Sequence, residues 1–281
     1  MSCWPARMIL SRRSWTPEMA RTLVSFHAHP DDEVLLTGGT LARAAAEGHR
    51  VVLVIATDGE AGLASRQATG GDLGRTRVAE LARSAQALGC ARIERLELPD
   101  SGWRGEEQAG DGAFSRMPVP TAAARLVDIL REEHADALTI YDPAGGYGHP
   151  DHQQVHRVGR FAATAVGTPR VLEATLPRER LQRAVRLAAM IPGLLDGVDP
   201  DSFARAFAPR AQITHRIDVH EHLEAKREAM AAHASQSTSD IGPRTLGLLL
   251  RLPKPVFRLI AGQEWFVQRG REAGRRNDVF A

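Results

Sequence analysis

Apolar residues along this chain fall into short continuous runs, separated by longer stretches in which apolar positions recur with a helical period. The runs cover residues 21–27, 51–56 and 137–141, and residues 93–98 alternate in the manner of a strand. Continuous apolar runs of this length, rich in β-branched residues, are typical of strands that are buried on both faces of a sheet. The pattern therefore predicts a strand at each of these places in the first half of the chain.

Helical periodicity occupies the segments between these strands. Apolar residues recur every three or four positions in residues 75–88, 121–134 and 152–166, and from Leu35 up to Gly48. Glycine is a common residue just beyond the end of a helix, so Gly48 is expected to end the first of these helices. Thr121 is expected to cap the start of the helix at 121–134.

Strands that alternate with helices predict an α/β fold with a Rossmann-like, doubly wound, mainly parallel sheet that carries helices on both faces. We expect an N-terminal extension at residues 1–20 and a single domain at 21–281, in which 178–212 and 240–262 are less regular insertions. The last third of the domain is a C-terminal elaboration, for which we predict strands at 170–175, 213–219 and 264–268 and helices at 178–195 and 220–233.

Two segments of this elaboration leave alternatives open. Residues 178–195 are amphipathic with basic residues on the polar face, which suits a membrane-surface helix or, in preference, a helix docked on the protein. Residues 243–255 combine leucines with prolines and are expected to pack over the core or against another subunit. A homo-oligomer is therefore an open alternative.

The composition of the 281-residue chain narrows the class of protein. An apolar content of 43% is ordinary for a globular protein, and a net charge of +2 gives no reason to expect nucleic acid as a partner. Two cysteines, Cys3 and Cys90, are too few for a disulfide framework or a cysteine-rich zinc site. No apolar run approaches the roughly 20 residues of a membrane span, and the N-terminal segment lacks the long apolar core of a signal peptide. We therefore expect a cytoplasmic enzyme without a membrane span.

Acidic residues crowd together behind the first predicted strand. Asp31, Asp32 and Glu33 follow directly on His29 and Pro30. Crowded carboxylates repel one another and resist burial unless a cation neutralises them. A bound metal ion would remove this conflict, with His29 as a nitrogen ligand and Asp32 as an oxygen ligand.

A second stretch, His149-Pro150-Asp151-His152, follows the fourth predicted strand. Parallel strands of a doubly wound sheet end at one edge, where ligands bind, so the topology brings both stretches to one site. Together they can supply His, Asp and His ligands to one zinc ion and leave a position for water. Three protein ligands with an open position are typical of a catalytic rather than a structural zinc.

In combination, the two stretches resemble the LmbE/PIG-L family of zinc-dependent N-acetylglucosaminyl deacetylases. The similarity extends from about residue 21 to residue 156 and includes Arg77-x-x-Glu80, a pattern of the family's usual helix. It continues more weakly at residues 226–230, with His233, Ser235 and Gln236. The first twenty residues and the region 178–212 lie outside it.

The resemblance implies a metal site and a general base. It makes His29, Asp32 and His152 the ligands of Zn²⁺, with another divalent transition metal as an alternative. Asp31 matches the family's general base, which takes a proton from the attacking water. Two adjacent carboxylates thus have two roles, and the implied chemistry is the hydrolysis of a linear amide C–N bond.

The resemblance also implies roles around the metal. His149 matches a residue that helps to stabilise the tetrahedral intermediate, and Tyr147 matches a tyrosine that hydrogen-bonds the developing oxyanion in some relatives. Asp151 is expected to orient a histidine. Arg77 and Asp100 match positions that contact sugar in relatives, and both are expected to face the cleft at the carboxyl ends of the strands.

These observations predict a zinc-dependent hydrolase that removes an N-acyl group, foremost N-acetyl, from a small glucosamine-containing glycoconjugate. The segment Asp100-Ser101-Gly102 resembles a stretch of mycothiol-pathway members and gives weak support to a sugar-inositol substrate. One alternative is an amidase that acts on a thiol-sugar conjugate. Another is a ligand-binding member of the fold without catalysis, although the intact Asp31 argues against it because binding alone needs no base.

Three further features have competing interpretations. His156 lies four residues after His152 and is a rival ligand on the same helical face, although an exposed position is favoured. Arg75 is an alternative to Arg77 in the sugar site. The pairs Gly38-Gly39 and Gly145-Gly146 lack the spacing of a phosphate-binding loop, which argues against nucleotide binding.

Overall fold

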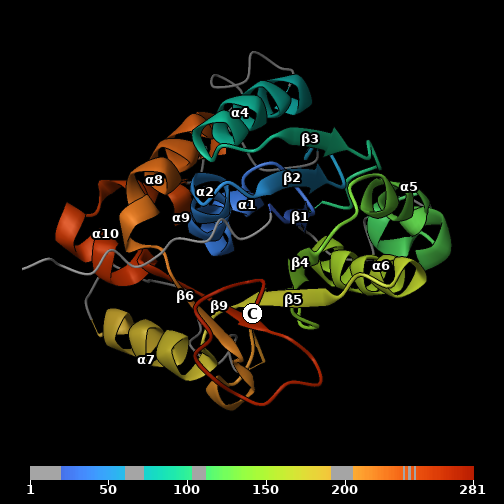
Figure 1. Cartoon of the computed structure of the whole chain (residues 1–281). Helices are drawn as coiled ribbons and strands as arrows, with labels where there is room; N and C mark the ends of the chain where they lie inside the picture. Colours follow the sequence, from blue (N-terminus) through green and yellow to red (C-terminus); the bar gives the residue numbers. More distant parts are fainter. Residues whose placement is uncertain are drawn as a thin grey trace, which may run out of the picture.

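The structure is a computed structural model that describes residues 20–60, 73–102, 112–190, 205–236, 238–239, 242–243 and 245–281. Figure 1 shows a central sheet flanked by helices. The sheet has seven strands in the order β3-β2-β1-β4-β5-β9-β6. Their bounds are β1 (Thr22–His27), β2 (Arg50–Ile55), β3 (Arg92–Arg95), β4 (Ala137–Tyr141), β5 (Arg170–Thr175), β6 (His215–Asp218) and β9 (Gln263–Val267).

The helices surround this sheet, and a small two-stranded sheet of β7 (Thr238–Ser239) and β8 (Gly242–Pro243) stands apart from it. The α-helices are α1 (Asp32–Leu36), α2 (Gly38–Ala46), α4 (Leu73–Ala87), α5 (Val119–Glu132), α6 (Pro150–Val166), α7 (Arg178–Ala189), α8 (Leu223–Ala232), α9 (Thr245–Arg251) and α10 (Lys254–Ala261). Short 3₁₀ turns are η1 (Phe114–Arg116), η3 (Arg210–Gln212), η4 (His220–His222) and η5 (Ala234–Gln236).

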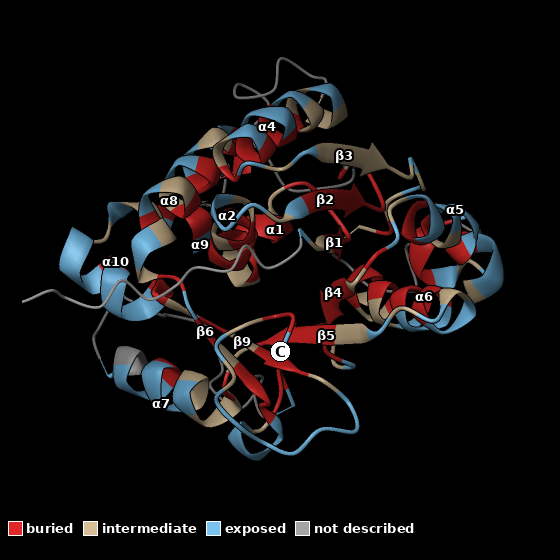
Figure 2. Ribbon diagram, in the orientation of Figure 1, coloured by how far each residue is buried: buried red, intermediate tan, exposed pale blue. Residues whose placement is uncertain are grey.

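Two hydrophobic cores lie on the two faces of the sheet. Successive residues of β1 alternate between them: Leu23 packs with side chains of α2, α4 and α8, whereas Val24 and Phe26 pack with side chains of α5 and α6. Figure 2 shows the buried residues concentrated on the strands and on the inner faces of these helices. The predicted α/β class is therefore confirmed, including helices on both faces.

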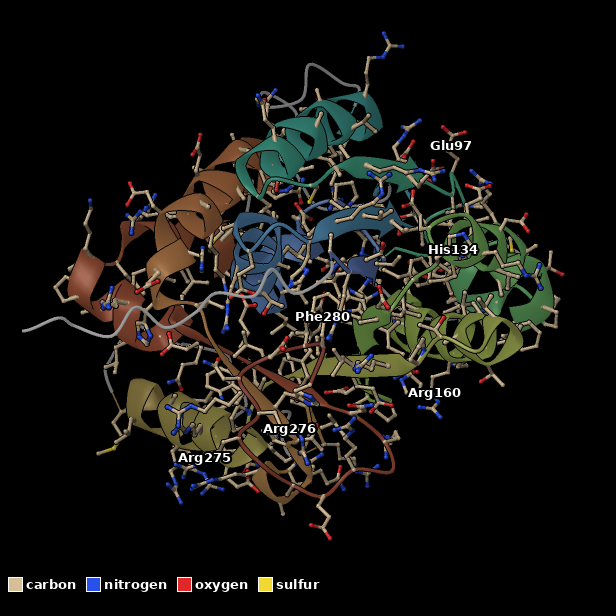
Figure 3. The ribbon with its side chains drawn as sticks, viewed as in Figure 1. Glu97, His134, Arg160, Arg275, Arg276 and Phe280 are labelled. Atoms are coloured by element: carbon tan, nitrogen blue, oxygen red, sulfur yellow. The ribbon has the colours of Figure 1, made fainter. Side chains whose placement is uncertain are left out.

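The sheet is mainly parallel, with one exception near its end. Strands β1 to β5 pair in parallel, whereas β9 is antiparallel to both β5 and β6. The C-terminal end of the chain packs beside the start of β1. There the Phe280 carbonyl accepts a hydrogen bond from Arg21 at 2.9 Å, and its ring packs on His49 (Figure 3).

Three helix predictions were wrong in detail. The helix predicted from Leu35 to Gly48 is broken into α1 and α2 at Thr37, and the carboxylate of Glu264 accepts hydrogen bonds from the backbone of Gly39 and Thr40. A Cβ at Gly39 would lie 2.6 Å from Val219, so the close approach requires glycine.

Helix α5 begins at Val119 rather than at a Thr121 cap, with Pro120 in its first turn. Proline is favoured there because its missing N–H has no partner within the helix. Helix α8 likewise begins at Leu223, after the turn η4.

Several predictions fall partly outside the described residues. Of the expected N-terminal extension, residues 1–20, the structure describes only residue 20. The predicted helix 178–195 is described only as far as residue 190. The segment 243–255 contains α9 and the start of α10. The single-domain assignment stays a prediction. None of the helices in the described ranges combines the length and the apolar character that are needed to cross a membrane.

An ion cluster joins the end of α5 to the sheet and gives a first testable prediction. Glu133 accepts hydrogen bonds from Arg50 at 2.5 Å and from Arg92 at 2.8 Å. These bonds lower the pKa of Glu133 from 4.5 to about 2, although burial opposes the shift. A lowered pKa stabilises the fold above pH 4.5, and this contribution is lost as the pH falls toward 2.

We expect Glu133→Gln to lower the free energy of unfolding at pH 7, because the neutral amide loses the charged hydrogen bonds to the two arginines. The expected loss is only about 1–2 kcal/mol, because water screens the exposed side of the cluster. Urea unfolding of both proteins at pH 7 and pH 3 measures this, and the difference between them should shrink at pH 3. An equal difference at both pH values would contradict the assignment of a lowered pKa to Glu133.

Candidate metal centre and active site

Two polar segments meet at the carboxyl ends of neighbouring strands. β1 and β4 pair directly, with Leu23 opposite Ala137. The segment after β1 enters α1, and the segment after β4 ends at His149, which is the N-cap of α6. This adjacency places the two stretches that the sequence singled out in one site.

His29, Asp32 and His152 converge at this point, and all three are buried. Oδ2 of Asp32 lies 3.2 Å from Nδ1 of His29 and 3.2 Å from Nε2 of His152. The backbone N–H of His29 also donates to this oxygen at 3.0 Å. Despite burial, which acts in the opposite direction, the two imidazoles hold the pKa of Asp32 well below its usual range.

The donor set fits a metal ion. Nε2 of His152 is buried and makes no hydrogen bond, although it lies beside the Asp32 carboxylate. Atoms bound tetrahedrally at about 2.0–2.2 Å from a zinc ion are separated by roughly 3.3–3.6 Å, close to the two distances from Asp32 to the imidazoles. Two groups of described residues have ligand atoms that all lie within 4.8 Å of one another: His29 with His149 and His152, and His29 with Asp100 and Asp151. The site is therefore able to hold a metal ion.

Asp151 lies against the opposite side of the His29 ring. Its Oδ2 is 3.1 Å from Nε2 of His29, and Oδ1 of Asp100 is 3.4 Å from the same nitrogen. Ser101, a residue that sequence reasoning did not single out by itself, donates to Asp151 through its hydroxyl at 2.5 Å. A carboxylate behind a ligand histidine orients the ring and strengthens it as a ligand. Although burial lowers it, these carboxylates raise the pKa of His29 well above 6.5.

Tyr141 was missed by sequence reasoning. Its ring stacks on His152 with centroids 4.2 Å apart and planes 8° apart, and its hydroxyl lies 3.1 Å from Nδ1 of His27. As the last residue of an apolar strand it looked like a core residue. Its place at the end of the strand was the only sequence feature that could have assigned it to the site. Burial lowers the pKa of His27 to about 4, so this ring is neutral and belongs to a polar network with Ser25 and Thr37.

Asp31 lies beside the three candidate ligands, and its backbone has an unusual conformation. Its φ is 107°, in the left-handed region that residues other than glycine rarely adopt. Oδ1 of Asp31 lies 3.3 Å from Nη2 of Arg77. Burial raises the pKa of Asp31, and Arg77 opposes that shift.

Arg77 lies beside Asp31 at the carboxyl edge of the sheet, but its guanidinium is bonded to protein groups. Its guanidinium is buried, donating to the carbonyl of Gly59 at 2.8 Å and to the carbonyl of Pro30 at 2.5 Å. A Cβ at Gly59 would lie 2.2 Å from Arg77, so this seat depends on glycine. We therefore do not assign Arg77 to the sugar hydroxyls, because protein groups next to Asp31 already hold its guanidinium.

His149 and Tyr147 both lie beside the ring of His152. The backbone N–H of Asp151 donates to Nδ1 of His149 at 3.2 Å, which places the proton of the neutral ring on Nε2. Burial and the neighbouring His29 and His152 lower the pKa of His149 to about 4. Tyr147 is 45% exposed, and its ring centroid lies 5.1 Å from that of His152.

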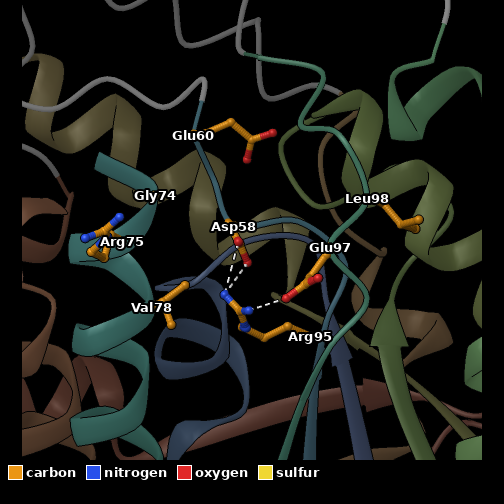
Figure 4. A pocket seen from close by; sticks show the side chains of 8 residues that line it. All are labelled: Asp58, Glu60, Gly74, Arg75, Val78, Arg95, Glu97 and Leu98. Atoms are coloured by element: carbon orange, nitrogen blue, oxygen red, sulfur yellow. Dashed lines mark hydrogen bonds and ion pairs between the residues drawn. The ribbon is translucent and has the colours of Figure 1, made fainter. Parts of the chain in front are cut away.

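A pocket of about 460 Å³ adjoins the site (Figure 4). It lies between the end of β2, the start of α4 and β3, and Arg95 in its lining pairs with Asp58 and Glu97. Glu60 connects it to the site by accepting a hydrogen bond from the backbone of Asp100 at 3.0 Å. Arg75, the alternative to Arg77, lines this pocket, whereas the candidate metal ligands do not.

Comparison with known proteins supports the same chemistry. Residues 24–163 match the PIG-L family model, described as GlcNAc-PI de-N-acetylase. The chain is 38% identical to a 1D-myo-inositol 2-acetamido-2-deoxy-α-D-glucopyranoside deacetylase of Streptomyces griseus, an alignment that covers 93% of this chain and 89% of the relative. The deacetylase of the same name from Rhodococcus jostii is 37% identical, with 92% and 97% covered.

The fold also matches a solved structure. The N,N′-diacetylchitobiose deacetylase of Pyrococcus horikoshii superposes with a TM-score of 0.56 at 23% identity, covering 89% of this chain and 84% of that one. At this identity the match establishes a shared fold.

Proposed function

Because the chain belongs to the PIG-L family of de-N-acetylases, and is thus a hydrolase of amide C–N bonds, we propose that it removes the acetyl group from N-acetylglucosamine linked to an inositol. The relatives that support this substrate carry it in their names and align over more than nine-tenths of this chain. The single observation that carries the proposal is the position of Asp31 beside a buried His, Asp and His cluster at one edge of the sheet.

We propose zinc as the metal of this family member, held by His29, Asp32 and His152. Two imidazoles and a carboxylate form the nitrogen and oxygen donor set that is common for catalytic zinc. Zinc in such a site supplies a Lewis acid for the amide carbonyl and lowers the pKa of water toward neutrality. Asp151 and Asp100 keep the His29 ring in place.

Asp31 acts as the general base in this proposal. Its carboxylate takes a proton from the attacking water while the new C–O bond forms, and the proton then passes to the amide nitrogen as the C–N bond breaks. Acetic acid and a free amine leave, and the acid releases its remaining proton to water to give acetate. Arg77 is a positioning residue, because its guanidinium contacts the Asp31 carboxylate and the carbonyl of Pro30 from a buried seat.

His149 and Tyr147 are the proposed donors to the oxyanion of the tetrahedral intermediate. The Nδ1 contact to Asp151 leaves the His149 proton on Nε2, so a neutral ring can donate. Tyr147 is exposed at the mouth of the site and can add a second donor from its hydroxyl. Preformed donors of this kind stabilise charge that develops in the transition state. Asp100, whose carboxylate accepts from the backbone of Gly102, is the proposed acceptor for a sugar hydroxyl.

The test is acetate release from three acetylated compounds by the metal-loaded protein. We expect kcat/KM on the N-acetylglucosamine–inositol conjugate to exceed that on free N-acetylglucosamine by roughly tenfold or more, because the inositol hydroxyls add contacts of about 1–3 kcal/mol. The third compound, an acylated thiol-sugar conjugate, represents the alternative of an amidase.

The outcomes separate the three functions. Preference for the thiol conjugate would favour the amidase, and no acetate release from any compound would favour a ligand-binding protein. Prior removal of metal with a chelator should abolish hydrolysis, and added Zn²⁺ should restore it. Activity that survives chelation, with no metal found by elemental analysis, would contradict a metal-dependent mechanism.

A further inference from the structure

Glu33 lies beside the metal centre and has no role in the proposed mechanism. It is the last acidic residue of the run behind β1 and is completely buried. Its Oε2 accepts a hydrogen bond from the backbone N–H of Asp31 at 2.9 Å. A buried carboxylate is costly unless donors surround it, so its partners indicate what it is for.

Two side chains from distant helical segments hold the other oxygen of Glu33. The hydroxyl of Ser84 on α4 donates to Oε1 at 2.6 Å, and Nε2 of His233, just after α8, lies 2.6 Å from the same atom. Ser84 and His233 are both completely buried. The carboxylate is thereby fixed from α4 and α8 and presents its second oxygen to the Asp31 backbone.

The Asp31 backbone needs such support. A φ of 107° is strained for an aspartate. A strained backbone persists only where several surrounding contacts hold it in place. Glu33 holds the N–H of Asp31, and Arg77 holds its carboxylate. The left-handed turn lets consecutive carboxylates face different partners, with Asp32 toward two imidazoles and Asp31 toward Arg77.

We propose that Glu33, fixed by Ser84 and His233, is a positioning residue that holds Asp31 in its left-handed conformation and so keeps the general base beside the metal centre. The inference rests on the proposed role of Asp31 as the base. It gives the segment around residue 233, some 200 positions further along the chain, a part in catalysis without contact with the substrate.

A matched control is present in the same fold. Glu264 is also a buried carboxylate, and it accepts hydrogen bonds from Lys226 on α8 at 2.6 Å and from two backbone N–H groups at 2.8 Å. Those N–H groups belong to Gly39 and Thr40, at the start of α2 rather than at Asp31. Glu264→Gln therefore disturbs a similar bond network that does not reach the base.

The experiment is a double-mutant cycle on kcat with bound metal measured in parallel. We expect Glu33→Gln to lower kcat by roughly ten- to a hundredfold, as outer-shell changes do, with KM and metal content changed by no more than about twofold. In the Asp31→Asn background, where no base is left to position, the same substitution should change the residual kcat by less than about threefold. Glu264→Gln should leave kcat within about threefold of the unchanged protein.

Three outcomes would overturn the inference. These are an unchanged kcat in Glu33→Gln, an equal loss in both backgrounds, and an equal loss in Glu264→Gln, since the last two indicate general structural damage. Near-normal turnover in Asp31→Asn would instead refute the base assignment itself, so the two failures are distinguishable.

Smaller changes keep the test available if Glu33→Gln does not fold. Ser84→Ala and His233→Phe each remove one donor to Glu33, and each should lower kcat in the Asp31 background but not in the Asp31→Asn background. His233→Gln keeps an N–H donor and is expected to recover part of the loss in His233→Phe. No recovery, together with the same loss in both backgrounds, would assign these residues to stability alone.

Discussion

Asp31→Asn is expected to keep the fold and the bound metal and to lose about 10²–10⁴-fold in kcat, the usual effect of removing a general base. The substitution preserves the shape of the side chain and the backbone N–H that Glu33 accepts from, but a neutral amide cannot take the proton of water. KM should change little, because Asp31 is assigned to proton transfer rather than to holding the sugar. The measurement is steady-state acetate release with zinc content checked by elemental analysis.

Asp58→Asn is a suitable control for this prediction. Asp58 also follows a strand at the carboxyl edge of the sheet and also pairs with an arginine, Arg95, at 3.1 Å. It lies in the neighbouring pocket rather than at the metal centre, so its loss should leave kcat within about threefold. If Asp31→Asn keeps normal turnover, another group is the base, and Asp151 and His149 are the next residues to replace.

The strands and the site's location could be predicted because their determinants are local. Continuous apolar runs placed β1, β2 and β4 within about one residue of their observed bounds. A parallel sheet then brings the ends of adjacent strands to one edge. The two histidine-containing stretches followed such strands, so their convergence followed from topology without knowledge of any side-chain contact.

Features that depend on distant side chains could not be predicted. The break between α1 and α2 reflects Glu264, which binds the backbone of Gly39 from 225 positions away. The buried seat of Arg77 depends on carbonyls of two other loops, so its pattern in the sequence was equally consistent with sugar binding. Tyr141 looked like a core residue and Glu33 like one more of the crowded acidic residues, because the sequence does not show which groups they contact.

His152→Ala should lower metal affinity by more than about 100-fold, beyond the upper range seen when only an outer-shell partner is removed. The substitution removes one of the three candidate protein ligands and leaves Asp32 with a single imidazole, His29. Hydrolysis should fall to the level of the chelated protein. Zinc content after dialysis, and titration of the metal-free protein with Zn²⁺, measure the change directly.

His156 offers a control one helical turn further along α6. Its Nδ1 lies 3.0 Å from the backbone carbonyl of Tyr141 and 3.8 Å from Glu173, so its ring is engaged away from Asp32. His156→Ala should therefore retain its zinc and most of its activity, although it removes the same chemical group from the same helix. Loss of zinc in His156→Ala with retention in His152→Ala would exchange the two assignments. Full zinc occupancy in both variants would mean that His29, Asp100 and Asp151, the other group with metal-like spacing, hold the ion instead.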